Sequence, residues 1–470
     1  MAVIFDIHDD LHGTVLLEAH ERKIVDSPLF QRLRRIRQLG LANLVFPGAE
    51  HTRFGHSIGV FHLASRLAQR LESATAITPE EARELRAAAL LHDIGHFPFS
   101  HTLEKVYEGL AQAQPEDWVE PVDGGEGPVG AFQGPHGIAE TQFHEDFGRR
   151  VIEETDYEGG VTQALHESEL DPQRVAAIVV GAHENVLLNQ IVHSDLDVDQ
   201  LDYLLRDAKA TGSAYGQYDL SYLIGCMEVV RVDGKPVLCV AMQGLHPLEH
   251  YVLAKYFYYM CILYQKTRCI AEGLLQAIAV RLIGKGRIPS WPDIEAALAE
   301  GRLPYFDDIA VWQAIRDAGD DESLEGELRD AISCLVDRRL PKVESERHVT
   351  IAQEEDLPGG VQFGATGHVW NELARDAVNR QCRQRFTVLR KVPYDAGDPH
   401  SLAMELEENP TPIRIVVKEP YDVPAGVLAL DAETLDGEAC RVALLESLTD
   451  SIVAKLAGQT THIARVYRPA

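Results

Sequence analysis

Residues 90–101 read LLHDIGHFPFSH, so four side chains that can bind a metal or carry a proton lie around one glycine. Residues 78–81 upstream, Thr-Pro-Glu-Glu, have the features of a helix start: a Thr cap, Pro at the first position and Glu three residues after the cap. We therefore expect a helix that begins here and ends near Gly95. Because Ala89 and His92 share an apolar stripe of that helix, His92 is predicted to point inward.

A buried His92 needs a partner, and the adjacent Asp93 can supply a second metal ligand. A lone histidine on an apolar face is more often a core residue than a ligand, but two other segments carry candidates. His56 opens an amphipathic helix. Asp199 lies in the acidic segment 194–207, too far inside its helix to be a cap. Such a nitrogen and oxygen donor set suits iron, manganese, zinc or magnesium better than copper(I).

These residues, His56, then His92-Asp93, then Asp199, resemble the H…HD…D signature of the HD-domain metal-dependent phosphohydrolases. Residues 26–40, 46–49 and 202–207 are similar to the branch that contains the sterile-alpha-motif and HD-domain deoxynucleotide triphosphohydrolases and their bacterial relatives. The resemblance spans about the first 210 residues and rests on several motifs in the right order. It implies a mainly α-helical HD-domain core and one divalent metal, with Mn or Fe favoured over Mg, Zn, Ni or Co.

The resemblance also implies roles for residues around the metal. Hydrolysis of a phosphate ester needs a polarising cation and further donors for the charge that develops on the phosphate. The residues that match the catalytic group of the family are His101, His96, His144 and Glu104. Those that match its substrate contacts are Gln38, Leu39, Arg53, Tyr203, Asp207 and Lys255. For Arg53 or Asp207 taken singly, the alternative interpretation is a surface ion pair.

The chain departs from the pattern of the branch at several positions. Gln200 follows the last metal aspartate, where the branch usually has Lys or Arg, and Lys255 stands where Arg is usual. Gln265 replaces a usual His, and Leu263 stands where a sugar-contacting Tyr is frequent, unless Tyr264 serves instead. Gln carries no charge, so the number of phosphates on the substrate is less firmly implied than the fold.

Regulation by a nucleotide is a separate expectation. Members of this branch can assemble into oligomers around activating guanine nucleotides, and Asp26, Gln31 and Arg34 occupy the matching positions. The resemblance thus implies a guanine nucleotide effector and a homo-oligomer, a dimer or tetramer. The alternative is that the arginines of residues 32–37 form a solvated helix face with Asp26 as its cap.

Composition limits the class of protein. With 470 residues and 45% hydrophobic residues, the chain can build more than one core. Its net charge of −29 opposes non-specific binding to nucleic acid but leaves room for a local basic pocket. The seven cysteines show no CxxC spacing, which is typical of reduced residues in a cytoplasmic protein. We expect no signal peptide, and no apolar stretch is long enough to span a membrane.

The pattern changes along the chain predict two regions. Residues 1–344 are assigned to the HD-domain core with a helical extension, including a β-hairpin around Asp233-Gly234, and residues 345–470 to a C-terminal α+β region. In the second region we expect strands at 385–390, 413–418 and 462–467 and an amphipathic helix at 438–457. A Gly-, Pro- and acid-rich insertion, 115–137, is expected to cover the active site.

The resemblance thus implies an enzyme that hydrolyses a deoxynucleoside triphosphate to deoxynucleoside and triphosphate. Two alternatives remain open at this point. One is an HD-domain hydrolase of nucleoside mono- or diphosphates, modified nucleotides or oligonucleotide ends. The other is a nucleotide-sensing oligomeric binding module with vestigial chemistry.

Overall fold

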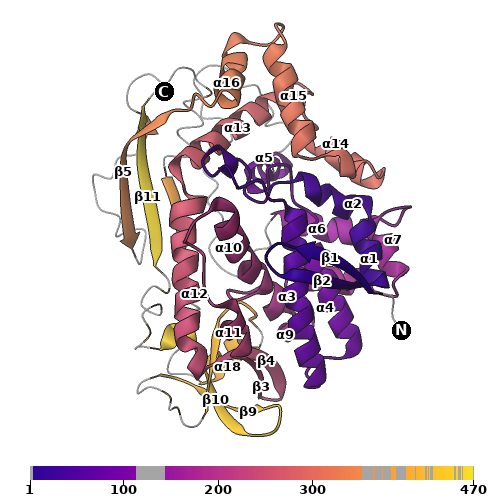
Figure 1. The fold of residues 1–470 in the computed structure, drawn as a ribbon, viewed down its shortest axis with the longest axis vertical. Helices are drawn as coiled ribbons and strands as arrows, with labels where there is room; N and C mark the ends of the chain where they lie inside the picture. Colours follow the sequence, from indigo (N-terminus) through magenta and orange to yellow (C-terminus); the bar gives the residue numbers. More distant parts are fainter. Residues whose placement is uncertain are drawn as a thin grey trace.

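The computed structural model describes residues 4–112 and 143–351, and shorter stretches of the remainder, chiefly 364–365, 383–387, 399–407, 409–418, 427–448 and 460–468. The insertion predicted at 115–137 lies outside the described residues. The architecture is mainly helical, as predicted, with small sheets at three places (Figure 1).

The N-terminal part begins with a hairpin and leads into the helices that carry the motifs. The hairpin is β1 (Ile4–Asp9) and β2 (Gly13–Glu18), paired antiparallel. The helices that follow are α1 (Ala19–Asp26), α2 (Pro28–Arg32), α3 (Arg53–Ser73), α4 (Pro79–Leu91), α5 (His101–Gln112), α6 (Phe143–Glu154), α7 (Val161–His166), α8 (Pro172–Val179), α9 (Val186–Val192) and α10 (Val198–Thr211). The hairpin was not predicted, because residues 1 to about 220 were expected to be mostly helical.

The rest of the chain adds a helical extension and two sheets. The helices are α11 (Leu220–Gly225), α12 (Leu245–Tyr258), α13 (Lys266–Gly284), α14 (Trp291–Ala299), α15 (Asp308–Asp320), α16 (Gly326–Val336) and α18 (Pro399–Glu407). The strands are β3 (Met227–Val232), β4 (Lys235–Ala241), β5 (Lys342–Ile351), β6 (Gly364–Ala365), β7 (Arg383–Thr387), β8 (Arg414–Val417), β9 (Leu430–Thr434), β10 (Ala439–Leu444) and β11 (Thr460–Arg468). No helix among the described residues is long and apolar enough to cross a membrane.

Helix α4 confirms the predicted start of the helix that leads to the first motif. The Thr78 side chain accepts a hydrogen bond from the backbone N–H of Glu81, and the Glu81 side chain accepts one from the backbone of Thr78. This capping box satisfies two backbone donors that the first turn leaves open. The helix ends at Leu91 with His92 as its C-cap, so the predicted metal ligands His92 and Asp93 lie at the start of the loop that follows α4.

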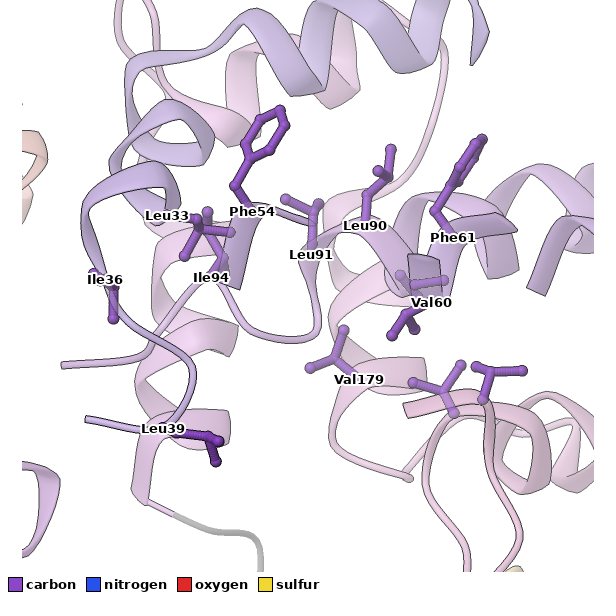
Figure 2. Close-up of a cluster of buried hydrophobic side chains, with 14 of the residues drawn as sticks. Leu33, Ile36, Leu39, Phe54, Val60, Phe61, Leu90, Leu91, Ile94 and Val179 are labelled. Atoms are coloured by element: carbon purple, nitrogen blue, oxygen red, sulfur yellow. The ribbon is translucent and has the colours of Figure 1, made fainter. Parts of the chain in front are cut away.

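The core beneath the motifs packs α3 against α4. Phe54, Val60 and Phe61 of α3 meet Leu90 and Leu91 of α4, and all are almost fully buried (Figure 2). Ile94 and Leu33 join the same cluster from the loops. Because close-packed side chains resist displacement, this cluster holds the ends of both helices in fixed positions.

A small closed barrel joins parts of the chain that are far apart in sequence. Its strand order is β10-β8-β4-β3-β9, and it lies at the lower end of the molecule in Figure 1. The predicted hairpin 227–241 is confirmed as β3 and β4, and β4 pairs in parallel with β8. The barrel therefore contains strands from both sides of residue 345, and the division there stays a prediction.

The predicted amphipathic helix at 438–457 is wrong for residues 439–447, and most of residues 449–457 lie outside the described residues. Residues 439–444 form β10, which pairs with both β8 and β9, and Leu445–Ser447 form a 3-10 turn. Pairing with a strand on each side gives the backbone N–H and C=O groups of β10 the hydrogen bonds that a helix would form internally. The segment is therefore a strand despite its helical periodicity. The strands predicted at 413–418 and 462–467 are confirmed within β8 and β11.

Candidate active site

Three of the four predicted metal ligands form a compact group. Ligand atoms of His56, His92 and Asp93 all lie within 4.8 Å of one another, and all three side chains are buried. His56 comes from the first turn of α3, and the other two follow α4. Asp199 approaches from α10, with its Oδ1 2.8 Å from Nε2 of His56 and 3.8 Å from Nε2 of His92. The side chain of Asp199 is 35% exposed, so this side of the group faces solvent.

Negative charge exceeds positive charge around this group. Burial alone would lower the pKa of His56, but the carboxylates of Asp199 and Asp202 raise it to about 10. Burial and the charge of Asp199 raise the pKa of Asp197, the N-cap of α10, to about 8. Both shifts mean that the site favours an added positive charge, either a proton or a metal cation.

The donor set fits a divalent metal. Two imidazole nitrogens and two carboxylates are borderline to hard ligands, as zinc, iron and manganese prefer. Asp202 accepts a hydrogen bond from Nδ1 of His56 at 2.8 Å, which leaves Nε2 as the atom that faces the other donors. A carboxylate behind a ligating histidine is the usual support of a metal site.

The predicted catalytic residues form a second cluster beside the first. His101 and His144 each contact a different oxygen of Glu104 through Nδ1, at 2.6 and 2.7 Å. The ring of His96 stacks on His144 with centroids 3.8 Å apart, and its Nε2 lies 3.1 Å from Oδ1 of Asp93. The four side chains are also close enough to hold a metal ion. His101 is the most open of them, with half of its side chain exposed.

The pKa values of the residues in the second cluster are shifted in different directions by their surroundings. Burial, together with the charges of Arg53 and His144, holds the pKa of His96 well below its usual value. Burial opposes the charged forms of Glu104 and His144, but their mutual attraction lowers the pKa of Glu104 and raises that of His144. The cluster therefore favours a neutral His96 and favours opposite charges on Glu104 and His144.

All of the predicted substrate residues line one cavity, which His92, Asp93 and Asp199 of the first group and His96, His101 and His144 of the second also line. The cavity has a volume of about 310 Å³, within the lower range of small-molecule sites. Its wall includes the predicted residues Gln38, Leu39, Arg53, Tyr203, Asp207 and Lys255. The carbonyl oxygen of the Gln38 side chain is buried and has no hydrogen-bond partner among the described residues, so it can accept a bond from a ligand.

Arg53 and Asp207 are not surface ion pairs. Arg53 is buried and donates to Asp93 Oδ2 at 2.7 Å and to the Ser100 hydroxyl at 2.8 Å. Asp207 is buried between the Tyr258 hydroxyl, at 2.5 Å, and His51 Nε2, at 2.6 Å. A buried, fixed charge at a cavity wall is more typical of a binding site than of a solvated surface.

The neutral Gln200 is held by its own helix cap. Its amide donates to the backbone oxygen of Ser194 at 2.6 Å and to Asp197 at 3.1 Å, and its carbonyl accepts from Tyr251 at 3.2 Å. Lys255, in contrast, is buried on the wall with its nearest carboxylate, Asp195, 3.9 Å away. Of the two neighbouring positions considered for a sugar contact, Leu263 lines the cavity.

Sequence reasoning missed several wall residues. They are Glu145, Val179, Val192, His193, Asp195, Tyr258, Tyr259, Arg268 and Thr411. Arg268 of α13 was not considered although it follows the Gln265-Lys266 pair closely, and it brings a guanidinium to the cavity. Thr411 comes from the far end of the chain, and no local pattern relates it to the motifs.

The predicted effector residues lie apart from the cavity. Asp26 and Arg34 are exposed and Gln31 is half-buried. Gln31 accepts from Arg34 at 2.8 Å, and Arg34 also stacks on Phe54 at 3.5 Å. The N-cap of α2 is Ser27, not Asp26, and Arg32 of the same row is buried against two backbone oxygens, so a fully solvated arginine face is wrong.

Comparisons with known proteins agree with this geometry. The HD-domain family model matches residues 53–207. An uncharacterized protein of Methanocaldococcus jannaschii is 31% identical over 310 residues, which cover 66% of this chain and 54% of that protein. Human deoxynucleoside triphosphate triphosphohydrolase SAMHD1 is 32% identical over 243 residues, which cover 50% of this chain and 37% of the human protein.

The chain thus spans about half the length of the curated relatives it matches. A solved phosphohydrolase of Bacteroides thetaiotaomicron covers 98% of this chain and 100% of its own, with a TM-score of 0.62 and 22% identity, and has a similar fold. The matched family region contains His56, His92, Asp93 and Asp199. Residues 53–207 thus match the HD domain, and the relatives support an HD-domain phosphohydrolase family for this chain.

Proposed function

We propose that this protein hydrolyses deoxynucleoside triphosphates to deoxynucleoside and triphosphate. The observation that carries the proposal is one cavity that joins a His/Asp metal group, a Glu104-centred histidine cluster and fixed cations. The likeness to SAMHD1, whose name states this activity, supports the choice of substrate. The chain acts in the cytoplasm in this proposal.

A divalent metal, manganese or iron, is held by His56, His92, Asp93 and Asp199; magnesium, zinc, nickel or cobalt are the other candidates. When bound, such an ion polarises a phosphoryl oxygen and lowers the pKa of a bound water. The buried carboxylate of Asp202 holds the His56 ring so that Nε2 stays turned toward the other three donors.

The chain's own residues provide the proton chemistry. His101 is half exposed to the cavity and is tied through Nδ1 to Glu104, which fixes the orientation of its ring. Its free Nε2 is the atom that exchanges a proton with the reacting phosphate ester or the leaving oxygen. The His144–Glu104 ion pair and the stacked His96 hold this ring in place and add donors for the phosphate.

The remaining wall residues hold the nucleotide. Arg53, Lys255 and Arg268 bring positive charge for the phosphates, which compensates in part for the neutral Gln200. Gln38 and Leu39 line the sugar and base end, with the unpaired Gln38 carbonyl oxygen as an acceptor. Tyr203 and Asp207 bind the sugar, because Asp207 is already oriented by Tyr258 and His51.

Regulation forms a further part of the proposal. Asp26, Gln31 and Arg34 form a surface group that can read guanine, with an amide, a carboxylate and a guanidinium as hydrogen-bonding partners. In this proposal GTP binds there and stabilises a homo-oligomer, a dimer or tetramer. The net charge of −29 keeps nucleic acid from binding non-specifically.

Product analysis tests the substrate and the reaction together. The protein is incubated with each common deoxynucleotide and ribonucleotide, with and without Mn²⁺ and GTP, and the products are separated by chromatography. Deoxynucleoside and triphosphate support the proposal. Cleavage of mono- or diphosphates alone favours the second enzyme class, which the neutral Gln200 supports, and nucleotide binding without products favours a binding module.

A further inference from the structure

The turn of the N-terminal hairpin reaches the back of the metal group. Asp202 of α10 uses Oδ2 to accept a hydrogen bond from Nδ1 of His56, at 2.8 Å. Its other oxygen, Oδ1, lies 2.6 Å from Nε2 of His12, which is in the turn between β1 and β2. The His12 side chain is only 5% exposed, and Asp202 is fully buried.

The chemistry of this contact fixes which nitrogen of His56 is free. An ionised carboxylate only accepts hydrogen bonds, so both imidazole nitrogens that face Asp202 carry hydrogens. With its proton on Nδ1, a neutral His56 has its lone pair on Nε2, the atom nearest Asp199 and His92. The orientation of Asp202 therefore decides whether His56 presents a ligand atom to the metal.

Several contacts fix His12 in this place. Asp9 accepts hydrogen bonds from the backbone N–H groups of Leu11, at 2.9 Å, and His12, at 2.8 Å, which orders the turn. Arg206 bridges Asp9 and Asp202, with an N–H donor 2.9 Å from Asp9 and another 2.7 Å from Asp202. The His12 ring also stacks on His62, with centroids 5.1 Å apart.

The helix that carries His56 leaves space for this network. A Cβ at Gly59 would lie 2.0 Å from Oδ1 of Asp202 and 2.4 Å from a terminal nitrogen of Arg206. Any larger residue would push Asp202 away from α3 and from His12. The absence of a side chain at Gly59 thus allows the carboxylate to reach both histidines at once.

We propose that His12 is a positioning residue for the metal ligand His56, acting through Asp202. Without the His12 donor, Oδ1 of Asp202 keeps only the Arg206 N–H donor, at 3.0 Å, and the carboxylate is freer to rotate away from His56. The His56 ring then loses its fixed orientation. Partners behind metal-ligating histidines commonly contribute about 10- to 100-fold to metal affinity, and the hairpin supplies this contribution from outside the family-matched region.

The test measures metal affinity in the full-length chain, with no nucleotide present. Metal is removed with a chelator, Mn²⁺ is titrated back, and free Mn²⁺ is followed by electron paramagnetic resonance. His12→Leu removes the donor but keeps bulk, whereas His12→Gln keeps an N–H at a similar reach. His8→Leu changes an exposed histidine of the same hairpin and serves as the control.

We expect His12→Leu to bind Mn²⁺ roughly 10-fold more weakly, with His12→Gln recovering most of the loss and His8→Leu equal to the parent. Equal affinities of His12→Leu and the parent would overturn the proposal, as would equal losses in the Leu and Gln variants.

Circular dichroism of the metal-free proteins monitors the fold. If His12→Leu does not fold, His62→Leu replaces it: weaker binding supports the proposal and unchanged binding overturns it. If the unaltered protein binds no Mn²⁺, both the proposed metal site and this inference are wrong, whichever substrate the protein acts on.

Discussion

At the scale of single residues, the four predicted metal donors differ in how firmly the protein holds them. His56, His92 and Asp93 are buried and packed at the ends of α3 and α4. Asp199 is more exposed and contacts the group through one oxygen. Because it closes the open side, Asp199 is the donor whose removal disturbs the fold least and the metal most.

Replacing Asp199 by Ala is expected to remove bound metal and nearly all hydrolytic activity. The change deletes one negative ligand from a site that depends on charge to hold a cation. Elemental analysis of purified protein measures the metal, and Asp320→Ala, an exposed position of α15, is the control. Full metal content and full rate in Asp199→Ala would show that the metal lies elsewhere.

The second cluster allows two interpretations that one variant can separate. His101→Ala is expected to lower turnover by a factor on the order of 100 to 10,000, because a proton donor or acceptor is lost, while the metal stays bound. Metal content and turnover are measured on the same preparation, beside His166→Ala as an exposed histidine control. Loss of metal together with activity would instead make the cluster of His96, His101, Glu104 and His144 a metal site of its own.

The sequence singled out the residues that the structure brings together, but not the residues that support them. His92, Asp93 and the histidines proposed as catalytic lie in short motifs, and His56 and Asp199 lie in the first turns of α3 and α10. The contacts of Asp202 with His12 and of Asp207 with His51 join residues 190 and 156 positions apart. No local periodicity encodes such pairs, since only the packing of helices brings them together.

At the scale of elements, the approach of α6 to the loop after α4 decides where His144 stands. A Cβ at Gly95 would lie 2.1 Å from the His144 carbonyl oxygen and 2.3 Å from the Gly148 backbone nitrogen. Both are backbone atoms, which cannot turn aside as a flexible side chain can. Helix α4 already ends at Leu91, so Gly95 serves this close approach and not the end of the helix, the role that the sequence suggested for it.

Gly95→Ala is expected to displace α6 and with it His144. We expect a loss of about 1–3 kcal/mol in the free energy of unfolding, as is typical of overpacking, and a clear fall in turnover with metal still bound. Urea unfolding and steady-state kinetics measure the two effects. Gly225→Ala in α11 meets no atom within 4 Å and is expected to be neutral or mildly stabilising. Equal behaviour of the two variants would contradict the close packing of α6.

The start of α4 and the hairpin of β3 and β4 were predicted from local signals, whereas the strand at 439–444 was not. Thr78 and Glu81 form the expected capping box, and Asp233-Gly234 turns the expected hairpin. Residues 439–444 become a strand because β8 and β9 lie on either side of them. These residues do have a helical periodicity, but the strands that pair with them come from other parts of the chain, which the local pattern does not reveal.

At the scale of the whole molecule, the barrel connects the C-terminal region to the active site. Thr411 lines the cavity, and its backbone oxygen accepts a hydrogen bond from the N–H of Asp195 at 3.0 Å. Strand β8 begins three residues later and pairs with β4 on one side and β10 on the other. The wall of the cavity at Thr411 is therefore fixed by a barrel built from both predicted regions.

Val416→Asp tests this dependence, because Val416 is fully buried in the barrel core. A buried carboxylate without a partner has no favourable way to keep its charge, so we expect a loss of more than about 4 kcal/mol in the free energy of unfolding. Ile309→Asp is the control: its side chain is 64% exposed on α15, and such surface changes typically stay within about 0.5 kcal/mol. With Trp118 and Trp370 replaced by Phe in parent and variants alike, urea unfolding followed by tryptophan fluorescence reports the helical part, since Trp291 and Trp312 lie in α14 and α15, outside the barrel. If the barrel and the helical core unfold as one unit, Val416→Asp shifts this signal strongly. An unshifted signal would mean that the two regions fold independently, and that the division at residue 345 or elsewhere separates true domains despite their shared barrel.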